Sequence, residues 1–218
     1  MMRWFTIVQV LVGVAMVGAG PSAAQPPAGA RPGVVRVRIE TSVGNFTLGL
    51  ETRRAPATTR NFLNYVDDGR LDGADIYRVA RARKAPHIGF IQGGIRSDAT
   101  RILPPFPLET TRQTGIKHLD GTISMARRAG PASAGGNFFI TVGPNPAMDW
   151  RPEFAGYGAF GRVIEGMPLV RRILAQPTGA RMNGTMLMRP IRILHAVRLD
   201  GVAKPTGRVQ PWKIMPRR

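Results

Sequence analysis

The stretch VVRVRIETSVGNFTLGL, residues 34–50, decides the architecture of this chain. Its two halves alternate apolar with other residues and are separated by the turn-forming segment Ser-Val-Gly-Asn. The alternating apolar residues are Val35, Val37, Ile39, Phe46, Leu48 and Leu50. A period of two is typical of a strand with one buried face. The stretch therefore predicts a β-hairpin at the start of a folded domain.

Short apolar segments continue along the chain, each bounded by glycine or proline. They span residues 75–80, 88–92, 121–126, 137–142 and 157–164. Ile191, Ile193 and His195 alternate near the end of the chain in the same way. Together with the hairpin, these segments predict about eight strands.

Two segments have helical periodicity instead. The first begins at Pro56, a residue that the first turn of a helix tolerates, and ends before the Asp-Asp-Gly sequence at 67–69. The second spans Met167 to Ala175. We therefore expect a mainly β fold, a closed eight-stranded antiparallel β-barrel capped by two α-helices, because closure removes exposed sheet edges.

Residues 1–24 have the pattern of a secretory signal peptide, with Arg3, an apolar run and the small residues Ser-Ala-Ala at 22–24. A membrane anchor is the alternative, but Gln9 and several glycines interrupt a run shorter than the roughly 20 residues that a spanning helix needs. We expect cleavage and no stable membrane insertion afterwards. A Pro/Gly/Ala linker at 25–33, one folded domain at 34–199 and a basic tail at 200–218 complete the predicted organisation.

The chain contains no cysteine, which excludes disulfides and thiolate metal sites. An export signal without cysteine favours a bacterial periplasm. The formal charge of +18 suggests anionic partners, although a genome that favours arginine explains it equally well. Basic residues are scattered and aromatic residues are only 7 % of the chain, so we expect no nucleic-acid partner. The tail is either solvated or in contact with an acidic partner.

Several kinds of chemistry are excluded by spacing. The segment GYGAFG at 156–161 matches the dinucleotide fingerprint, but no helix opens within it and no acidic residue follows about 20 positions later. His87, His118 and His195 lack partners at metal-ligand spacings, so we assign them structural or surface roles and expect neither a metal nor a cofactor. No serine elbow, cysteine nucleophile or P-loop is present. An arginine and an amide among apolar residues remain, in the segment IYRVARARKAPHIGFIQGG at 76–94.

An arginine and an amide side chain among apolar residues could catalyse rotation about the X–Pro peptide bond. The barrier to this rotation, about 18–20 kcal/mol, comes from delocalisation of the nitrogen lone pair into the carbonyl group. A guanidinium that donates to the prolyl nitrogen of the twisted amide binds the transition state more strongly than the ground state.

Five segments resemble, in order, blocks of the cyclophilin family of peptidyl-prolyl isomerases. They are IYRV (76–79), GFIQGG (89–94), GTISMA (121–126), GGNFFITVG (135–143) and YGAFGRVIEGMPLVRRI (157–173). The resemblance covers residues 35–198 and is closest to the periplasmic bacterial branch, where a tyrosine such as Tyr157 replaces a histidine. It implies an eight-stranded barrel capped by two helices and proline-containing polypeptide clients, whose folding after export the protein would assist.

The resemblance also implies site residues. Arg78 corresponds to the catalytic arginine, and Gln92 corresponds to the glutamine that orients it. The implied proline pocket is formed by Phe90, Phe139 and Met148, with Tyr157 at its rim. The implied peptide contacts are Ala126 and Arg127, through the backbone, and Asn137.

Four departures from the family pattern are visible. Residues 80–88 form an insertion, which we expect to be a remodelled loop beside the site. Gly89 replaces an aromatic residue, and Asn137 replaces a longer glutamine. The tryptophan of some members falls near Ala147, where Trp150 is a candidate substitute.

Two alternatives to an enzyme stay open. The first is a binding module or chaperone of this fold that holds proline-containing or acidic segments. The second is a polyanion binder, which predicts strongly salt-dependent affinity. No long exposed apolar run is evident, so we expect a monomer.

Overall fold

The structure is a computed structural model that describes residues 31–128, 130 and 133–214. The predicted signal peptide and most of the predicted linker lie outside the described residues. Within the described part of the chain, no helix combines the length and apolar character needed to cross a membrane.

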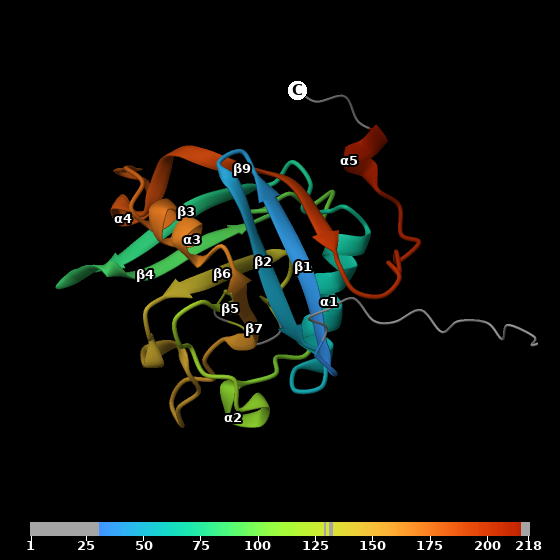
Figure 1. Cartoon of the computed structure of the whole chain (residues 1–218), viewed down its shortest axis with the longest axis horizontal. Coiled ribbons are helices and arrows are strands. Elements are labelled where there is room, and N and C mark those ends of the chain that lie inside the picture. The colour runs from blue at the N-terminus through green and yellow to red at the C-terminus, as the bar shows by residue number, and fades with distance from the viewer. Residues whose placement is uncertain (1–30, 129, 131–132, 215–218) are drawn as a thin grey trace, which may run out of the picture.

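Eight antiparallel strands form a closed barrel (Figure 1), which confirms the predicted fold. They are β1 (Val34–Thr41), β2 (Gly44–Glu51), β3 (Asp75–Ala82), β4 (Ala85–Gly94), β5 (Thr122–Met125), β6 (Asn137–Val142), β7 (Gly158–Glu165) and β9 (Met186–Arg198). The hydrogen-bonded order is β1-β2-β7-β5-β6-β4-β3-β9, and β9 returns to β1. A two-residue strand, β8 (Thr178–Gly179), pairs with β9 outside this ring.

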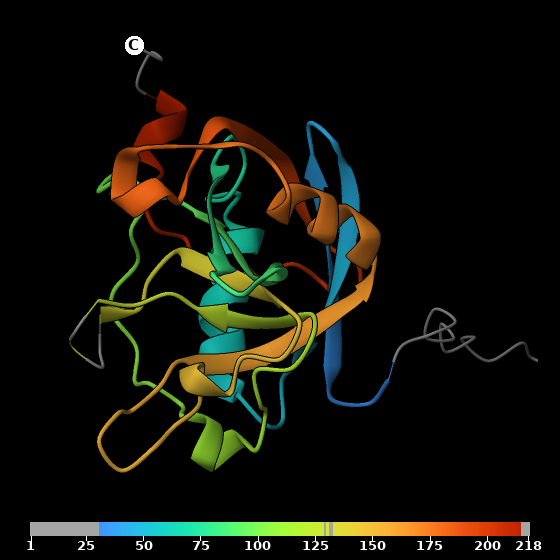
Figure 2. The same ribbon diagram turned by 90° about the vertical axis from the view of Figure 1, so that its left-hand side faces the viewer.

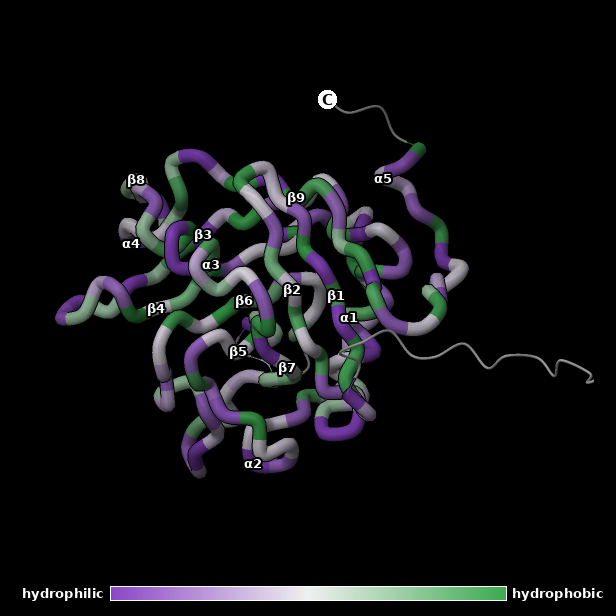
Figure 3. Tube along the Cα trace, viewed as in Figure 1, coloured by the Kyte–Doolittle hydropathy of each residue, from purple (hydrophilic) through white to green (hydrophobic). Residues whose placement is uncertain are grey.

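The predicted hairpin forms the start of the barrel. Val37 pairs with Leu48 and Ile39 with Phe46, and all four side chains are buried. The turn begins β2 at Gly44, whose φ of 126° is strained for any other residue. Figure 3 shows the resulting alternation of hydrophobic and hydrophilic residues along β1. The period-two pattern therefore decides which face of each strand enters the core.

Two longer helices pack against the barrel, α1 (Pro56–Asp67) and α3 (Met167–Leu174) (Figures 1 and 2), as predicted. The Glu109 carboxylate accepts hydrogen bonds from the backbone amides of Ala57 and Thr58 at the start of α1. A negative charge is stabilising there because the N-terminal end of the helix dipole is positive. Phe62 of α1 meets the rings of Phe138 and Phe160 inside the barrel, at centroid distances of 5.6 and 5.3 Å. Short turns complete the structure: α2 (Thr111–Thr114), the 3₁₀ turn η2 (Pro146–Met148), α4 (Arg181–Gly184) and α5 (Pro211–Ile214).

The insertion at 80–88 is not a loop, and this expectation was wrong. It extends β3 and β4 into a projecting hairpin with Arg83 and Lys84 at its turn, visible at the left of Figure 1. Arg81 anchors the hairpin, because its Nε donates to the carbonyl of Leu174 at 2.8 Å, at the C-terminal end of α3. A positively charged guanidinium is stabilising there because the C-terminal end of the α3 helix dipole is negative. The extension is therefore tied to the body of the barrel near its base.

The segment after β9 packs against the end of α1. The Arg36 guanidinium pairs with Asp200, and Thr206 donates to the buried Asp68. The indole of Trp212 lies 4.7 Å from the guanidinium carbon of Arg70, a side chain that is only 2 % exposed. Most residues between 201 and 209 are exposed. The described part of the tail, residues 200–214, is thus exposed over most of its length but held to the domain at these points.

Candidate active site

Arg78 projects from β3 immediately after a bulge. The register of β3 shifts between Ile76 and Arg78 against both neighbouring strands, and Ile76 and Val79 are both in the core. An extra residue in a strand re-aims the side chains that follow it. The shift places Arg78 on the outer face of the barrel, directly opposite Gln92 of β4.

Two hydrogen bonds hold the Arg78 guanidinium. Its Nη1 donates to Oε1 of Gln92 at 3.0 Å, and its Nε donates to Oγ1 of Thr185 at 3.1 Å. Nη2 makes no hydrogen bond with any residue that the structure describes. The guanidinium carbon also lies 5.3 Å from the ring centroid of Phe90. Arg78 thus presents one unsatisfied pair of N–H groups beside an aromatic surface.

Gln92 is itself oriented by a chain of polar groups. Its Nε2 donates to the hydroxyl of Tyr77 at 2.8 Å, and that hydroxyl donates to Oδ1 of Asn137 at 3.3 Å. Burial raises the pKa of Tyr77, so the hydroxyl keeps its proton. Asn137 also exchanges two hydrogen bonds of 2.7 Å with the backbone of Arg96. The amide of Asn137 is therefore committed to the barrel.

Three of the residues predicted to line the apolar pocket and its rim, Phe90, Phe139 and Tyr157, lie together. Phe139 follows the core residue Phe138 on β6 and so faces the opposite side of the sheet. Its ring centroid lies 5.5 Å from that of Phe90 and 5.2 Å from that of Tyr157. Met148 joins them through its carbonyl, which accepts the backbone amide of Tyr157 at 3.1 Å. The rings of Phe90, Phe139 and Tyr157 form an aromatic surface next to Arg78.

A buried polar chain lies beneath this surface. The Nδ1 of His118 is 2.8 Å from Oδ1 of Asp149, and its Nε2 is 3.1 Å from Oγ of Ser124. The arrangement has the composition of a hydrolase triad, but Ser124 and His118 are inaccessible. The imidazole stacks on Phe139 instead. The chain therefore supports the pocket, consistent with the structural role predicted for His118.

The two residues predicted to pair with a peptide differ in availability. The amide of Ala126 donates to the carbonyl of Asn137 at 2.9 Å and is used within the barrel. The guanidinium of Arg127 donates to the carbonyl of Gly156 and lies over the rings of Phe154 and Tyr157. Arg127 thus joins the rim of the pocket through its side chain.

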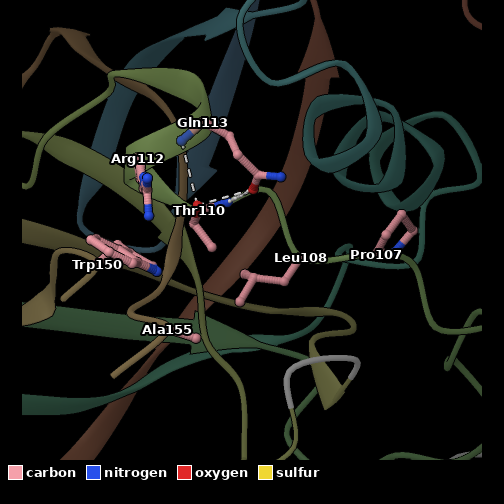
Figure 4. Close-up of a pocket in the computed structure, with 7 residues that line it drawn as sticks. All are labelled: Pro107, Leu108, Thr110, Arg112, Gln113, Trp150 and Ala155. Atoms are coloured by element: carbon pink, nitrogen blue, oxygen red, sulfur yellow. Dashed lines mark hydrogen bonds between the residues drawn. The ribbon is translucent and has the colours of Figure 1, made fainter. Parts of the chain in front are cut away.

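Trp150 belongs to a separate, shallow cavity of about 600 Å³ (Figure 4). Figure 4 shows its indole beside Arg112, with the guanidinium carbon 4.5 Å from the ring centroid. The other lining residues are Pro107, Leu108, Thr110, Gln113 and Ala155. Among the described residues, Trp150 makes no ring contact with Phe90 or Phe139, and its suggested role as a substitute for the family's tryptophan stays a prediction.

Two residues that matter here, Tyr77 and Thr185, were missed by sequence reasoning. Tyr77 contacts Gln92 and Thr185 contacts Arg78, and no sequence spacing indicates either contact. Tyr77 sits within the quoted IYRV segment, so its position next to Arg78 was the one available signal. Among the described residues, no group of three or more His, Asp or Glu side chains is placed to hold a metal ion.

The model of the cyclophilin-type peptidyl-prolyl cis-trans isomerases matches residues 36–198, the whole barrel. The chain belongs to this family. Peptidyl-prolyl cis-trans isomerase A of Dickeya dadantii is 35 % identical over 147 residues, covering 67 % of this chain and 75 % of the relative. Peptidyl-prolyl cis-trans isomerase B of Escherichia coli is 31 % identical over 146 residues, covering 66 % and 86 %.

The fold has a counterpart of known structure. A crystal structure of a cyclophilin-type isomerase from Cryptosporidium parvum superimposes with a TM-score of 0.61 at 20 % identity, covering 78 % of this chain and 99 % of that one. The cyclophilin described here is thus a peptidyl-prolyl cis-trans isomerase that acts on proline-containing polypeptides.

Proposed function

We propose that this cyclophilin catalyses isomerisation through Arg78, with Gln92 as its positioning partner. The observation that carries the proposal is the asymmetric tethering of the guanidinium. Nε and Nη1 are held, Nη2 makes no hydrogen bond with the described residues, and the guanidinium carbon lies 5.3 Å from the centroid of the Phe90 ring. A pre-oriented donor costs little reorganisation when charge develops in the transition state.

The proposed reaction needs no covalent step. The prolyl ring of the substrate packs against Phe90, Phe139 and Met148, with Tyr157 at the rim. As the X–Pro amide twists, its nitrogen becomes pyramidal and regains a localised lone pair. Nη2 of Arg78 donates to that lone pair, and the interaction is absent in the planar ground state. The bond relaxes to either isomer without any net proton transfer.

We assign the protein to the periplasmic branch of the family, where it would assist the folding of exported polypeptides. Support comes from the signal-like segment at 1–24, the absence of cysteine and the tyrosine at position 157. Cleavage of that segment would leave a charge of +17, which attracts acidic clients. We propose that it acts as a monomer, because the closed barrel leaves little free sheet edge among the described residues.

The test is catalysis of cis-to-trans isomerisation of a short proline peptide by the protein lacking residues 1–24. Arg78→Ala should lower kcat by about 100- to 1000-fold, the usual effect of removing one preorganised donor. Arg78→Lys keeps the charge but loses the planar fork and should stay strongly impaired.

A folded Arg78→Ala variant with wild-type turnover would disprove the mechanism. A wild-type protein that binds proline peptides without accelerating their isomerisation would instead support the binding-module alternative.

A further inference from the structure

Thr185 contacts Arg78 from a different part of the chain. Its Oγ1 accepts the Nε–H of Arg78 at 3.1 Å and donates its own proton to the carbonyl of Met182 at 2.7 Å. A hydroxyl has one proton and two lone pairs. Because the proton is committed to Met182, a lone pair is directed toward the guanidinium.

The backbone fixes Thr185 to the strand that carries Arg78. The carbonyl of Thr185 accepts the amide of Val79 at 2.9 Å. The next residue, Met186, is the register partner of Arg78 where β9 pairs with β3. The hydroxyl and the base of the arginine side chain are therefore held in one rigid unit.

The chain enters Thr185 through an unusual turn. Met182 has φ 49° and ψ 52°, Asn183 has φ 55° and ψ 41°, and Gly184 has φ 78°. Two successive non-glycine residues in the left-handed region are unfavourable and persist only where the surroundings hold them. Hydrogen bonds from the amide and the hydroxyl of Thr185 to the carbonyl of Met182 close this turn. The result of the strained path is a hydroxyl placed against Nε.

Resting on the proposed function of Arg78, we propose that Thr185 is a positioning residue for the isomerase reaction. A single hydrogen bond, from Nη1 to Oε1 of Gln92, would leave the guanidinium free to pivot. The second bond, from Nε to Thr185, fixes its plane and hence the direction of Nη2. Gln92 and Thr185 come from opposite sides of Arg78, on β4 and next to β9.

The test compares Thr185→Val, which keeps the shape and loses the hydroxyl, with Thr185→Ser, which keeps the hydroxyl. Thr185→Val should lower kcat about tenfold with little change in KM, because misorientation of a catalytic group affects the transition state. Thr185→Ser should restore most of the turnover. Thr206→Val is the matched control, since it removes a hydrogen-bonded loop hydroxyl in the segment near α5, well separated from α4 in Figure 1.

Two further measurements separate positioning from a structural role. In the Arg78→Ala background, Thr185→Val should have no additional effect, because the hydroxyl would act only through the guanidinium. The Nε–H resonance of Arg78 in a ¹⁵N spectrum should shift and exchange faster with water in Thr185→Val, and not in Thr206→Val.

Wild-type kcat in Thr185→Val, or an equal loss with and without Arg78, would overturn the positioning role while leaving Arg78 as the catalyst. Wild-type turnover in Arg78→Ala would instead refute the proposed function itself, and the positioning role in catalysis with it.

Discussion

The imidazole of His118 lies parallel to the ring of Phe139, with centroids 5.7 Å apart and ring planes inclined by 14°. His118 thus lies against the buried side of the aromatic surface formed by Phe90, Phe139 and Tyr157, and its two hydrogen bonds lock its orientation. Burial lowers the pKa of His118, and nearby Lys117 adds to this effect while Asp149 opposes it. The stacked ring is neutral at physiological pH.

The stability of the protein should therefore fall as the pH drops below about 6.5, the pKa of an unperturbed histidine. Above that pH, both the folded and the unfolded state hold a neutral ring. Below it, the unfolded state binds a proton that the folded state resists, until the pH reaches the lowered folded pKa. The free energy of unfolding should decrease by up to about 1.4 kcal/mol per pH unit in this window.

Urea denaturation at pH 7.5 and 5.5 measures this effect, and both values lie above the range in which carboxylates titrate. His118→Gln removes the titrating ring and should flatten the difference. An equally steep loss in that variant would assign the pH dependence to other groups.

Tyr77→Phe should reduce turnover several-fold, up to about tenfold, without unfolding the barrel. The change removes only the hydroxyl that accepts from Gln92, so the amide that positions Arg78 gains freedom to rotate. The loss of turnover in Gln92→Ala should be at least as large, because Tyr77 affects the reaction only through the side-chain amide of Gln92. A greater loss in Tyr77→Phe than in Gln92→Ala would contradict this order of action.

Gly89 is required by the close approach of β4 to β3 at the base of the projecting hairpin. A Cβ at this position would overlap the carbonyl oxygen of Ala80 on the neighbouring strand. Gly89→Ala should therefore destabilise the protein by about 1–3 kcal/mol, the usual cost of overpacking. Gly179→Ala is the control, since its nearest neighbour is 3.7 Å away and it should change stability by less than about 0.5 kcal/mol. Thermal denaturation of both variants gives the comparison, and equal midpoints would refute it.

Trp212→Ala should destabilise the domain although the residue lies far outside the barrel sequence. The Nη2 of Arg70 is buried without a hydrogen-bond partner in the described structure, and the Trp212 ring covers this guanidinium. Loss of the cation–π contact should lower the free energy of unfolding by about 1 kcal/mol. Val209→Ala, at a residue 74 % exposed in the same segment, should have little effect. Equal stability of the two variants in urea would show that the tail contributes nothing there.

The strands and helices of the barrel could be predicted from the sequence because alternation and helical periodicity depend only on neighbouring residues. The alternation at 34–50 and the helix from Pro56 needed only neighbouring residues, and both were confirmed. The hairpin was mistaken for a loop because ARARKAPH (80–87) contains no large apolar residue and includes a proline. It is a strand pair because the flanking strands continue and Arg81 ties it to Leu174, almost a hundred residues away in the chain.

The candidate site likewise contains residues that local sequence identifies and residues that only the folded structure brings together. Arg78, Gln92, Phe90 and Phe139 lie in segments with distinctive neighbours, so resemblance to a family located them. Thr185 stands in a strained turn 107 residues from Arg78, and only the folded register of β3 and β9 brings it there. Its role is a product of tertiary structure, which no window of sequence contains.

The pairing of the first strand with the last has a consequence for biosynthesis. β1 finds its second partner only in β9, so the ring cannot close until residue 198 has left the ribosome. Such long-range pairing folds slowly and leaves a nascent chain open while it is being made. The topology that makes a closed barrel therefore also delays closure until the last strand is available, and an open chain is the form that the proposed export would require.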